Sequence, residues 1–463
     1  MARRQSEVYV FSHVGQADGH RFVPSGILRL TETGGANVRN RELASEFAYG
    51  TGYLERRESF ELDPVSLAFG DRQGIRGKAL FPVNGLAEFG GIRDAAPDAW
   101  GRRVIEARLG APANSLLEVE YLLHAGGDRV GALDVRQART SPDTPSASDM
   151  HSLPYVLQAA EAVENGAPVP ASLETFLGAG PSAGGARPKA AVRDDDGALW
   201  LAKFPARGDT FDVARAEACT LALARRCGLT VPEVRHLDLG GRSVMLIRRF
   251  DRYWVHAGQR LPEGALHDTR PGDGRIEARL PFVSGLTLVA CSELESPDKT
   301  YADLGRAVRR FVHPAAVRAS AEELFARMVL NIFVTNDDDH WRNHGFVRDP
   351  RLGGWVLSPL YDVVPRPVIA SERRLHLGVG EQGKLATLDN ALSHHAAFVP
   401  ERPAAVAIMR RVWGEVRQWK TCFEEHGADG RLIDQLTRAF RDISDIASPE
   451  LEDEIRRGRP SKV

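Results

Sequence analysis

The order of strands and helices predicted for the middle of this chain limits most strongly what it can fold into. The stretches 188–192 and 198–206 are typical of strands, residues 212–229 have the apolar spacing of a helix, and residues 243–252 contain another strand-like apolar run. Two adjacent strands, a helix and a further strand in that order build an α+β lobe. From residue 279 onward the apolar spacing becomes mostly helical. We therefore predict an α+β lobe followed by a helical one.

The chain is long enough for several domains. With 463 residues and 43% hydrophobic content it can bury a large core, and ordinary domain sizes favour two or three domains over one. The first part alternates short strand-like runs with turns, which predicts a small α+β domain. The strand-like runs are 8–11, 27–30 and 129–133, and the helical stretches include 97–109, 153–164, 302–311 and 321–333. We predict an N-terminal domain over 1–138, a Pro/Ser-rich linker over 139–152, the α+β lobe over 153–250, the helical lobe over 251–445 and a charged tail over 446–463.

Charge and composition exclude several classes of protein. Lys and Arg total 60 and Asp and Glu total 62, so no global basic field favours direct nucleic-acid binding. No apolar run approaches the roughly 18 residues that a membrane span needs. The four cysteines are scattered without metal-site spacing and are typical of buried residues in a reducing compartment. We expect a cytoplasmic protein that does not bind membranes.

A glycine-rich stretch at 178–192 precedes the first strand of the lobe. Its residues 180–184 fit the G-x-S-x-G pattern of an esterase, with Ser182 as the nucleophile. That interpretation fails on context, because the glycines lead into a strand-like run and no matching Asp and His follow in strand-end positions. A loop that wraps a phosphate, with Lys189 behind it, and an ordinary turn both remain open.

Lys203 is the single lysine of the apolar strand-like run 199–205, where a lysine needs an anionic partner. Glu217 lies 14 residues downstream among alanines on a predicted helix. A strand lysine that neutralises nucleotide phosphates and is held by a helix carboxylate has this pattern. The same pattern would also arise if both residues were solvent-exposed and had no shared role.

Asn and Asp residues gather at 331–347, between two apolar runs. Asp338 is followed five residues later by Asn343, which is the spacing by which a kinase catalytic loop accepts a hydroxyl proton and holds Mg²⁺. A surface acidic turn is the alternative. A Ca²⁺ loop is disfavoured, because no Gly and no terminal Glu fall at EF-hand positions.

A strand-like run at 355–365 carries one carboxylate, Asp362, which is either a metal ligand or a turn cap. Each of these features alone is weak. Their order is more specific: glycine-rich loop, strand lysine, helix glutamate, acidic loop with a downstream Asn, and a further Asp. This is the order of parts in a phosphoryl-transfer enzyme.

The motifs resemble the HipA-type serine/threonine kinase toxins of bacterial toxin–antitoxin systems over nearly the whole chain. The matching stretches are "RDAAPDAWGRR" at 93–103, "SAGGARPK" at 182–189, "LAKFP" at 201–205, "RRFDR" at 248–252, "NDDDHWRNHGF" at 336–346 and "LSPLYDV" at 357–363. The resemblance implies a small N-terminal α+β domain followed by a bilobal kinase domain, distantly similar to protein and phosphoinositide kinases, with a mostly helical C-terminal lobe.

The resemblance also implies ATP and Mg²⁺ as cofactors and assigns roles to individual residues. Lys203 and Asp338 would be catalytic, Asn343 and Asp362 would bind Mg²⁺, and Ser182 would be autophosphorylated. The nucleotide-binding residues would be Ser182, Gly184, Gly185, Lys189, Lys203, Glu217, Arg248, Phe250, His340, Asn343 and Asp362. Two positions depart from the family pattern: Asp337 replaces a common Thr, and Arg248 lies where some members have a hinge acid.

For partners, the resemblance implies a helix-turn-helix antitoxin, operator DNA contacted mainly through that antitoxin, and an aminoacyl-tRNA synthetase as protein substrate. Two alternatives remain open. The chain could be a co-repressor with weak catalysis, using Arg3, Arg4 and the basic tail on DNA, or a kinase of small molecules.

Overall fold

A computed structural model of the chain describes residues 3–16, 19–33, 42–144, 148–167, 169–170, 173, 186–262, 266, 269–272 and 274–457. The chain divides into two compact units. The sheet unit comprises Met1–Arg207, Leu246–Ala290 and Val347–Arg351, and the helical unit comprises Gly208–Met245, Cys291–Phe346 and Leu352–Val463. Each unit is therefore assembled from separate stretches of sequence. The domain boundaries predicted from the sequence stay a prediction.

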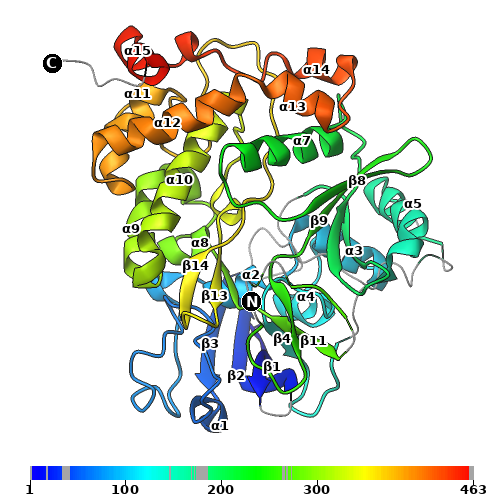
Figure 1. The fold of residues 1–463 in the computed structure, drawn as a ribbon. Helices are drawn as coiled ribbons and strands as arrows, with labels where there is room; N and C mark the ends of the chain where they lie inside the picture. The colour runs from blue at the N-terminus through cyan, green and yellow to red at the C-terminus, as the bar shows by residue number, and fades with distance from the viewer. Residues whose placement is uncertain are drawn as a thin grey trace. The chain divides into compact units, whose positions relative to one another are not determined.

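The first sheet of the sheet unit is antiparallel, with the strand order β3-β2-β1-β4 (Figure 1). Side chains along β2 and β3 alternate in burial, because one face of this sheet packs on a hydrophobic core that includes Val10, Leu28 and Phe47. The strands are β1 Arg3–Gln16, β2 Gly19–Thr33, β3 Glu42–Tyr49 and β4 Leu133–Arg136. The nearby helices are α1 Thr51–Leu54, α2 Gly90–Asp94, α3 Ala99–Leu109 and α4 Glu118–His124.

The strand predicted at 129–133 is wrong in position. The structure starts β4 only at Leu133, and a turn occupies the residues before it. Gly131 takes a left-handed backbone conformation with a φ of 82°, and its N–H donates to the carboxylate of Asp251. The apolar pattern at 130–133 thus reflects burial of a turn and not a strand. The helix predicted at 97–109 is confirmed as α3, with Asp98 as its N-cap.

The second sheet has the strand order β5-β6-β7-β9-β8. Its strands β6, β7 and β9 are the three strands predicted from the sequence. The β6–β7 hairpin places Lys189 directly opposite Lys203. The bounds are β5 Ser148–Asp149, β6 Lys189–Arg193, β7 Leu199–Lys203, β8 Val234–Asp238 and β9 Ser243–Arg248. Helix α5, Leu153–Glu164, has the predicted bounds. The further elements of the sheet unit are β10 Arg252–His256, β11 Arg275–Arg279, β12 Phe282–Ser284 and α8 Gly285–Val289.

The helical unit is built around α10, Pro314–Val334, whose second half is buried on every side. Its length exceeds the predicted 321–333, because Pro314 and the His313 side chain start the helix two turns earlier. The other helices are α7 Val213–Arg226, α9 Tyr301–Phe311, α11 Leu388–Ser393, α12 Arg402–Val416, α13 Trp419–Glu425, α14 Gly430–Leu436 and α15 Pro449–Arg457 (Figure 1). A third sheet has the strand order β12-β13-β14, where β13 is Gly345–Asp349 and β14 is Gly354–Leu357.

A buried cluster of charges gives the "RRFDR" motif a structural role in the sheet unit. The Asp251 carboxylate is fully buried and accepts from Arg249 Nη2 at 2.6 Å and from Arg252 Nη1 at 2.7 Å. The same two arginines donate to the backbone carbonyls of Asp128, Arg129 and Gly131. The motif thus ties the strand end at residue 248 to the turn before β4.

In the part of the chain that the structure describes, no helix combines the length and apolarity needed to cross a membrane.

Candidate active site

The acidic loop begins where α10 ends. Thr335 adopts the left-handed backbone conformation with a φ of 51°, and its hydroxyl donates to the Ala439 carbonyl at 2.6 Å. This conformation stops the helix, because a left-handed residue cannot continue right-handed helical hydrogen bonding. The next residues, 336–340, therefore leave the helix as a loop, and the short 3₁₀ helix Trp341–Asn343 (η7) follows.

Asp338 lies at the exposed edge of this loop. Its side chain is 59% exposed, and its carboxylate oxygen Oδ2 accepts from Arg366 Nη2 at 2.9 Å. The amide nitrogen of Asn343 donates to the Asp338 carbonyl at 3.1 Å. The two residues that the spacing singled out are thus in contact, and Asn343 holds the backbone of Asp338.

Asp339 is adjacent in sequence but points into the core. Its Oδ2 accepts from Asn331 Nδ2 at 2.7 Å and from the Tyr301 hydroxyl, and it lies 3.0 Å from His344 Nε2. Burial by itself raises the pKa of Asp339, but the charge and hydrogen bond of His344 and the Tyr301 hydrogen bond outweigh burial and lower that pKa. The buried network holds Asp339 as a carboxylate and anchors the loop to α9 and α10.

Asp337 and Asp338 share one cation. Arg366 Nε lies 3.0 Å from Asp337 Oδ1, while its Nη2 binds Asp338. Burial raises the pKa of Asp337, Arg366 lowers it, and the neighbouring Asp338 raises it. Arg366 therefore opposes the repulsion between two neighbouring carboxylates.

The segment that carries Asp362 runs beside this loop. The Tyr361 hydroxyl donates to the Arg342 carbonyl at 2.7 Å, and the Arg366 N–H donates to the Thr335 carbonyl at 3.2 Å. Asp362 itself has a left-handed φ of 61°, which is uncommon outside glycine and is typical of functional or turn positions. Hydrogen bonds from residues on both sides of Asp362 thus hold its segment against the loop that carries Asp338 and Asn343.

The donor set of these residues fits a hard cation with few protein ligands. Asn343 uses its amide nitrogen on Asp338, which leaves its amide oxygen for a metal, and Asp362 offers a carboxylate. Mg²⁺ is commonly held by one or two protein oxygens together with substrate phosphates. Within the described ranges, no group of three or more His, Cys, Asp or Glu side chains is arranged to hold a metal. The arrangement is compatible with Mg²⁺ bound largely through a substrate.

His340 lies in the same loop. Its ring contacts that of His376 edge to face, with centroids 6.2 Å apart, and its backbone N–H donates to the Asp338 carbonyl at 2.9 Å. Burial, followed by His340 and Lys384, lowers the pKa of His376. His340 is therefore held next to Asp338, and its role in nucleotide binding stays a prediction.

The predicted residues of the sheet unit have defined surroundings. Lys189 is buried, and its Nζ lies 2.6 Å from Asp98 Oδ2, so its ammonium group pairs with the N-cap of α3. Arg248 donates to the Thr269 carbonyl at 2.5 Å, and its guanidinium lies 5.4 Å from the centre of the Trp254 ring. Phe250 contacts Phe282. These contacts account for the burial of the Lys189 and Arg248 side chains. The roles of the three residues in nucleotide binding stay a prediction.

Two further predicted residues, Lys203 and Glu217, belong to different units. Lys203 ends β7 in the sheet unit and is half-buried, whereas Glu217 is buried on α7 in the helical unit, so their pairing stays a prediction. Ser182, Gly184 and Gly185 lie outside the described residues.

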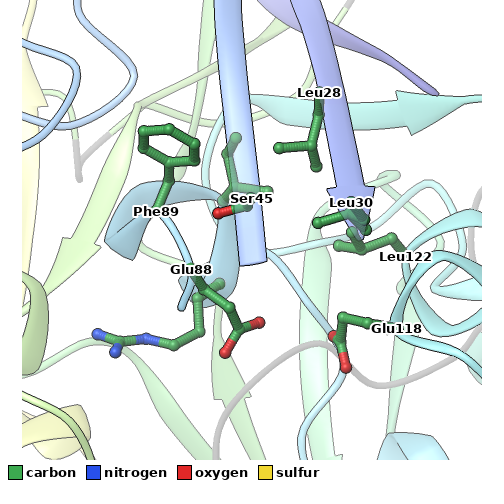
Figure 2. Close-up of a pocket in the computed structure, with 9 residues that line it drawn as sticks. Leu28, Leu30, Ser45, Glu88, Phe89, Glu118 and Leu122 are labelled. Carbon is green, nitrogen blue, oxygen red and sulfur yellow. The ribbon is translucent and has the colours of Figure 1, made fainter. Parts of the chain in front are cut away.

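The sheet unit also contains a small recess, drawn in Figure 2. Leu28 and Leu30 of β2 and Leu122 of α4 form its apolar part, and Glu118 lies at its edge. Arg102 already pairs with Glu118 at 2.7 Å. None of the predicted site residues is among the residues that line the recess, so we do not assign it to nucleotide binding.

Comparison with known proteins identifies a family for this chain. Residues 181–420, about half of the chain, match the family described as HipA-like C-terminal domain. The chain belongs to the HipA-like family. The resemblance predicted from the motifs is therefore confirmed.

Two similar proteins show how far the similarity extends. A Sinorhizobium fredii (strain NBRC 101917 / NGR234) protein named "Putative kinase Y4mE" is 24% identical over 348 residues, which cover 70% of this chain and 74% of the relative. The solved HipA from the Shewanella oneidensis MR-1 toxin–antitoxin system, in complex with HipB and operator DNA, is 13% identical and has a TM-score of 0.59 over 92% of this chain and 94% of its own. The mixed α+β fold predicted from the sequence is confirmed.

Sequence reasoning missed several residues of this candidate site. Arg366 lies 28 residues from Asp338, so no spacing rule links them. Tyr301 and Asn331 lie on α9 and α10 within ordinary apolar helical patterns. A polar Asn331 in the buried half of α10 was the available signal, because a buried amide needs partners.

We expect Asp339→Asn to lower activity through the loop and to destabilise the helical unit. The neutral amide cannot accept from all three donors, and leaving buried polar groups unsatisfied costs about 1–3 kcal/mol. The free energy of unfolding, followed by urea titration, should fall by this amount. Asp429→Asn at the N-cap of α14 is the matched control, because Asn caps helices as well as Asp does. Equal stability of Asp339→Asn and wild type would contradict the anchoring role.

Proposed function

We propose that the chain is an ATP- and Mg²⁺-dependent serine/threonine protein kinase. The observation that carries the proposal is the exposed Asp338 carboxylate, paired with Arg366 and backed by Asn343, in a chain that belongs to the HipA-like family. A surface acidic turn has no need of a buried network behind it, whereas a catalytic loop must be held in place. The name of the S. fredii relative, which calls it a putative kinase, supports the same reaction class.

In the proposed reaction, a hydroxyl oxygen forms a bond to the γ-phosphorus of ATP while the bond from that phosphorus to the β–γ bridging oxygen breaks. The bonding electron pair leaves with ADP, and the hydroxyl proton passes to the carboxylate of Asp338. Lys203 is proposed to bind phosphate oxygens. Asn343 and Asp362 are proposed to hold Mg²⁺, which neutralises charge on the phosphates when it is bound.

We further propose the remaining family roles for this chain. Arg248 and Phe250 would contact adenine, and Gly184, Gly185, Lys189, Glu217 and His340 would support the nucleotide. Ser182 would be autophosphorylated, adding about −1.5 to −2 charge to the loop and repelling the incoming nucleotide. A helix-turn-helix antitoxin is the proposed partner, with operator DNA contacted mainly through it. The solved HipA complex, which contains HipB and operator DNA, supports an antitoxin and DNA as partners. An aminoacyl-tRNA synthetase is the proposed substrate, in the cytoplasm.

Radiolabel from γ-labelled ATP tests the function. After incubation with Mg²⁺ and a cell extract, label should appear on protein, and mass spectrometry should find phosphate on Ser182 of the chain. Label on a metabolite instead would favour the small-molecule kinase. Absence of transfer, with repression of an operator reporter by the chain and its antitoxin, would favour the co-repressor.

Loss of the metal ligand gives a separate prediction. We expect Asp362→Asn to bind ATP normally without metal but to lose most of the increase in affinity that Mg²⁺ provides, because one of the two proposed ligands loses its negative charge. Calorimetric titration with ATP, with and without Mg²⁺, measures this difference. Asp298→Asn, in another loop of the helical unit, is the control. Equal Mg²⁺-ATP affinity in Asp362→Asn and wild type would make Asp362 a turn residue.

A further inference from the structure

Arg366 bridges two neighbouring carboxylates in the helical unit. Its Nη2 lies 2.9 Å from Asp338 Oδ2 and its Nε 3.0 Å from Asp337 Oδ1. Its backbone N–H donates to the Thr335 carbonyl at 3.2 Å, at the point where α10 ends. The arginine is therefore fixed at its backbone and bound to both carboxylates at its guanidinium.

The contact matters because consecutive carboxylates repel each other. The side chains of Asp338 and Arg366 are 59% and 49% exposed, so the pair contributes little to the core, and a role in stability alone does not account for it. Among the described residues, Arg366 is the only cation within ion-pair distance of the Asp338 carboxylate. A guanidinium can hold two acceptors at once in a fixed geometry, which an ammonium group cannot do as well.

We propose that Arg366 is a positioning residue for phosphoryl transfer. It holds Asp338 by Oδ2 and offsets the repulsion from Asp337, which leaves Oδ1 to accept the proton of the acceptor hydroxyl. The inference rests on the proposed function of Asp338 as the base. It goes beyond that function because it identifies the residue that orients the Asp338 carboxylate, and this residue comes from a segment distant in the sequence.

Steady-state kinetics of Arg366→Gln test the proposal. The acceptor is a serine/threonine peptide library, with ATP and Mg²⁺, and ADP release is measured. We expect kcat to fall about ten- to a hundredfold, since misplacing a reacting group by 1 Å can cost about 10²-fold, with KM for ATP nearly unchanged. Arg366→Lys should recover part of kcat because it keeps the charge. Asp337→Asn in the Arg366→Gln background should also recover part, because it removes the repulsion.

Two controls separate this proposal from the proposed function. Arg374→Gln removes another exposed arginine of the same segment, which pairs with Glu372 and not with Asp338, and it should keep wild-type kinetics and thermal stability. If Arg366→Gln matches or exceeds the wild-type rate while Asp338→Asn is inactive, the positioning role is overturned and the base remains. If Asp338→Asn keeps the wild-type rate, the base and Arg366 are both overturned.

Discussion

Asp338→Asn should abolish phosphoryl transfer and leave the fold intact. The amide cannot accept the hydroxyl proton, and a positioned general base contributes about 10²- to 10⁴-fold in rate. The fold should survive because the carboxylate is 59% exposed and its side chain pairs only with the half-exposed Arg366 among the described residues. Label transfer from γ-labelled ATP measures the rate, and thermal unfolding measures the fold.

The matched control for this variant is Asp453→Asn. Asp453 is 53% exposed and pairs with Arg457 on α15, so the substitution makes the same change of charge in a similar ion pair. We expect wild-type transfer from it. A folded Asp338→Asn protein that labels substrate as well as Asp453→Asn does would remove Asp338 from the chemistry.

Asp251→Asn should cause the largest loss of stability. It removes the negative charge between two buried arginines, Arg249 and Arg252, and breaking a buried ion pair by removing one partner costs about 3–5 kcal/mol. The turn at Gly131 loses its anchor as well. Urea unfolding followed by tryptophan fluorescence should show a lower midpoint. Glu7→Gln, which breaks an exposed pair with Arg29, should cost less than about 1 kcal/mol.

The pH dependence of stability gives an independent readout of the same cluster. Burial alone raises the pKa of Asp251, but Arg249 and Arg252 outweigh burial and hold that pKa well below its ordinary value. The unfolded state therefore takes up the proton first as pH falls, so the contribution of Asp251 is complete above its ordinary pKa and is lost in acid. The stability gap between wild type and Asp251→Asn should narrow as pH drops below about 4. A constant gap across this range would contradict the assignment.

The adjacent Asp338 and Asp339 show how the fold assigns different tasks to like residues. Both are aspartates of one loop, yet Asp338 is exposed and Asp339 is buried against Tyr301, Asn331 and His344. The turn at Thr335 decides which carboxylate faces outward, because the direction of each side chain follows from the backbone that precedes it. Sequence spacing singled out Asp338 from its distance to Asn343, and nothing in the spacing indicated a role for Asp339.

Local patterns in the sequence determined the elements and the candidate chemistry. Apolar patterns predicted β6, β7, α5, α7 and α9 close to their observed bounds, because a short continuous apolar run is typical of a strand buried on both faces and helical spacing records which face of a helix is buried. The contact between Asp338 and Asn343 could also be predicted from the sequence, since the two residues are five positions apart. The strand at 129–133 was predicted wrongly, because an apolar run records burial and not backbone conformation.

Only the tertiary structure decided which distant residues complete the site and the buried charge cluster around Asp251. Arg366 reaches Asp338, Tyr301 and Asn331 reach Asp339, and Asp251 anchors the turn at Gly131, over separations of 28, 38, 8 and 120 residues. Such contacts depend on how helices and loops pack, and a single sequence has no periodicity that links them. A charged side chain found in an apolar stretch shows that a partner exists, and the packed fold alone shows which one it is.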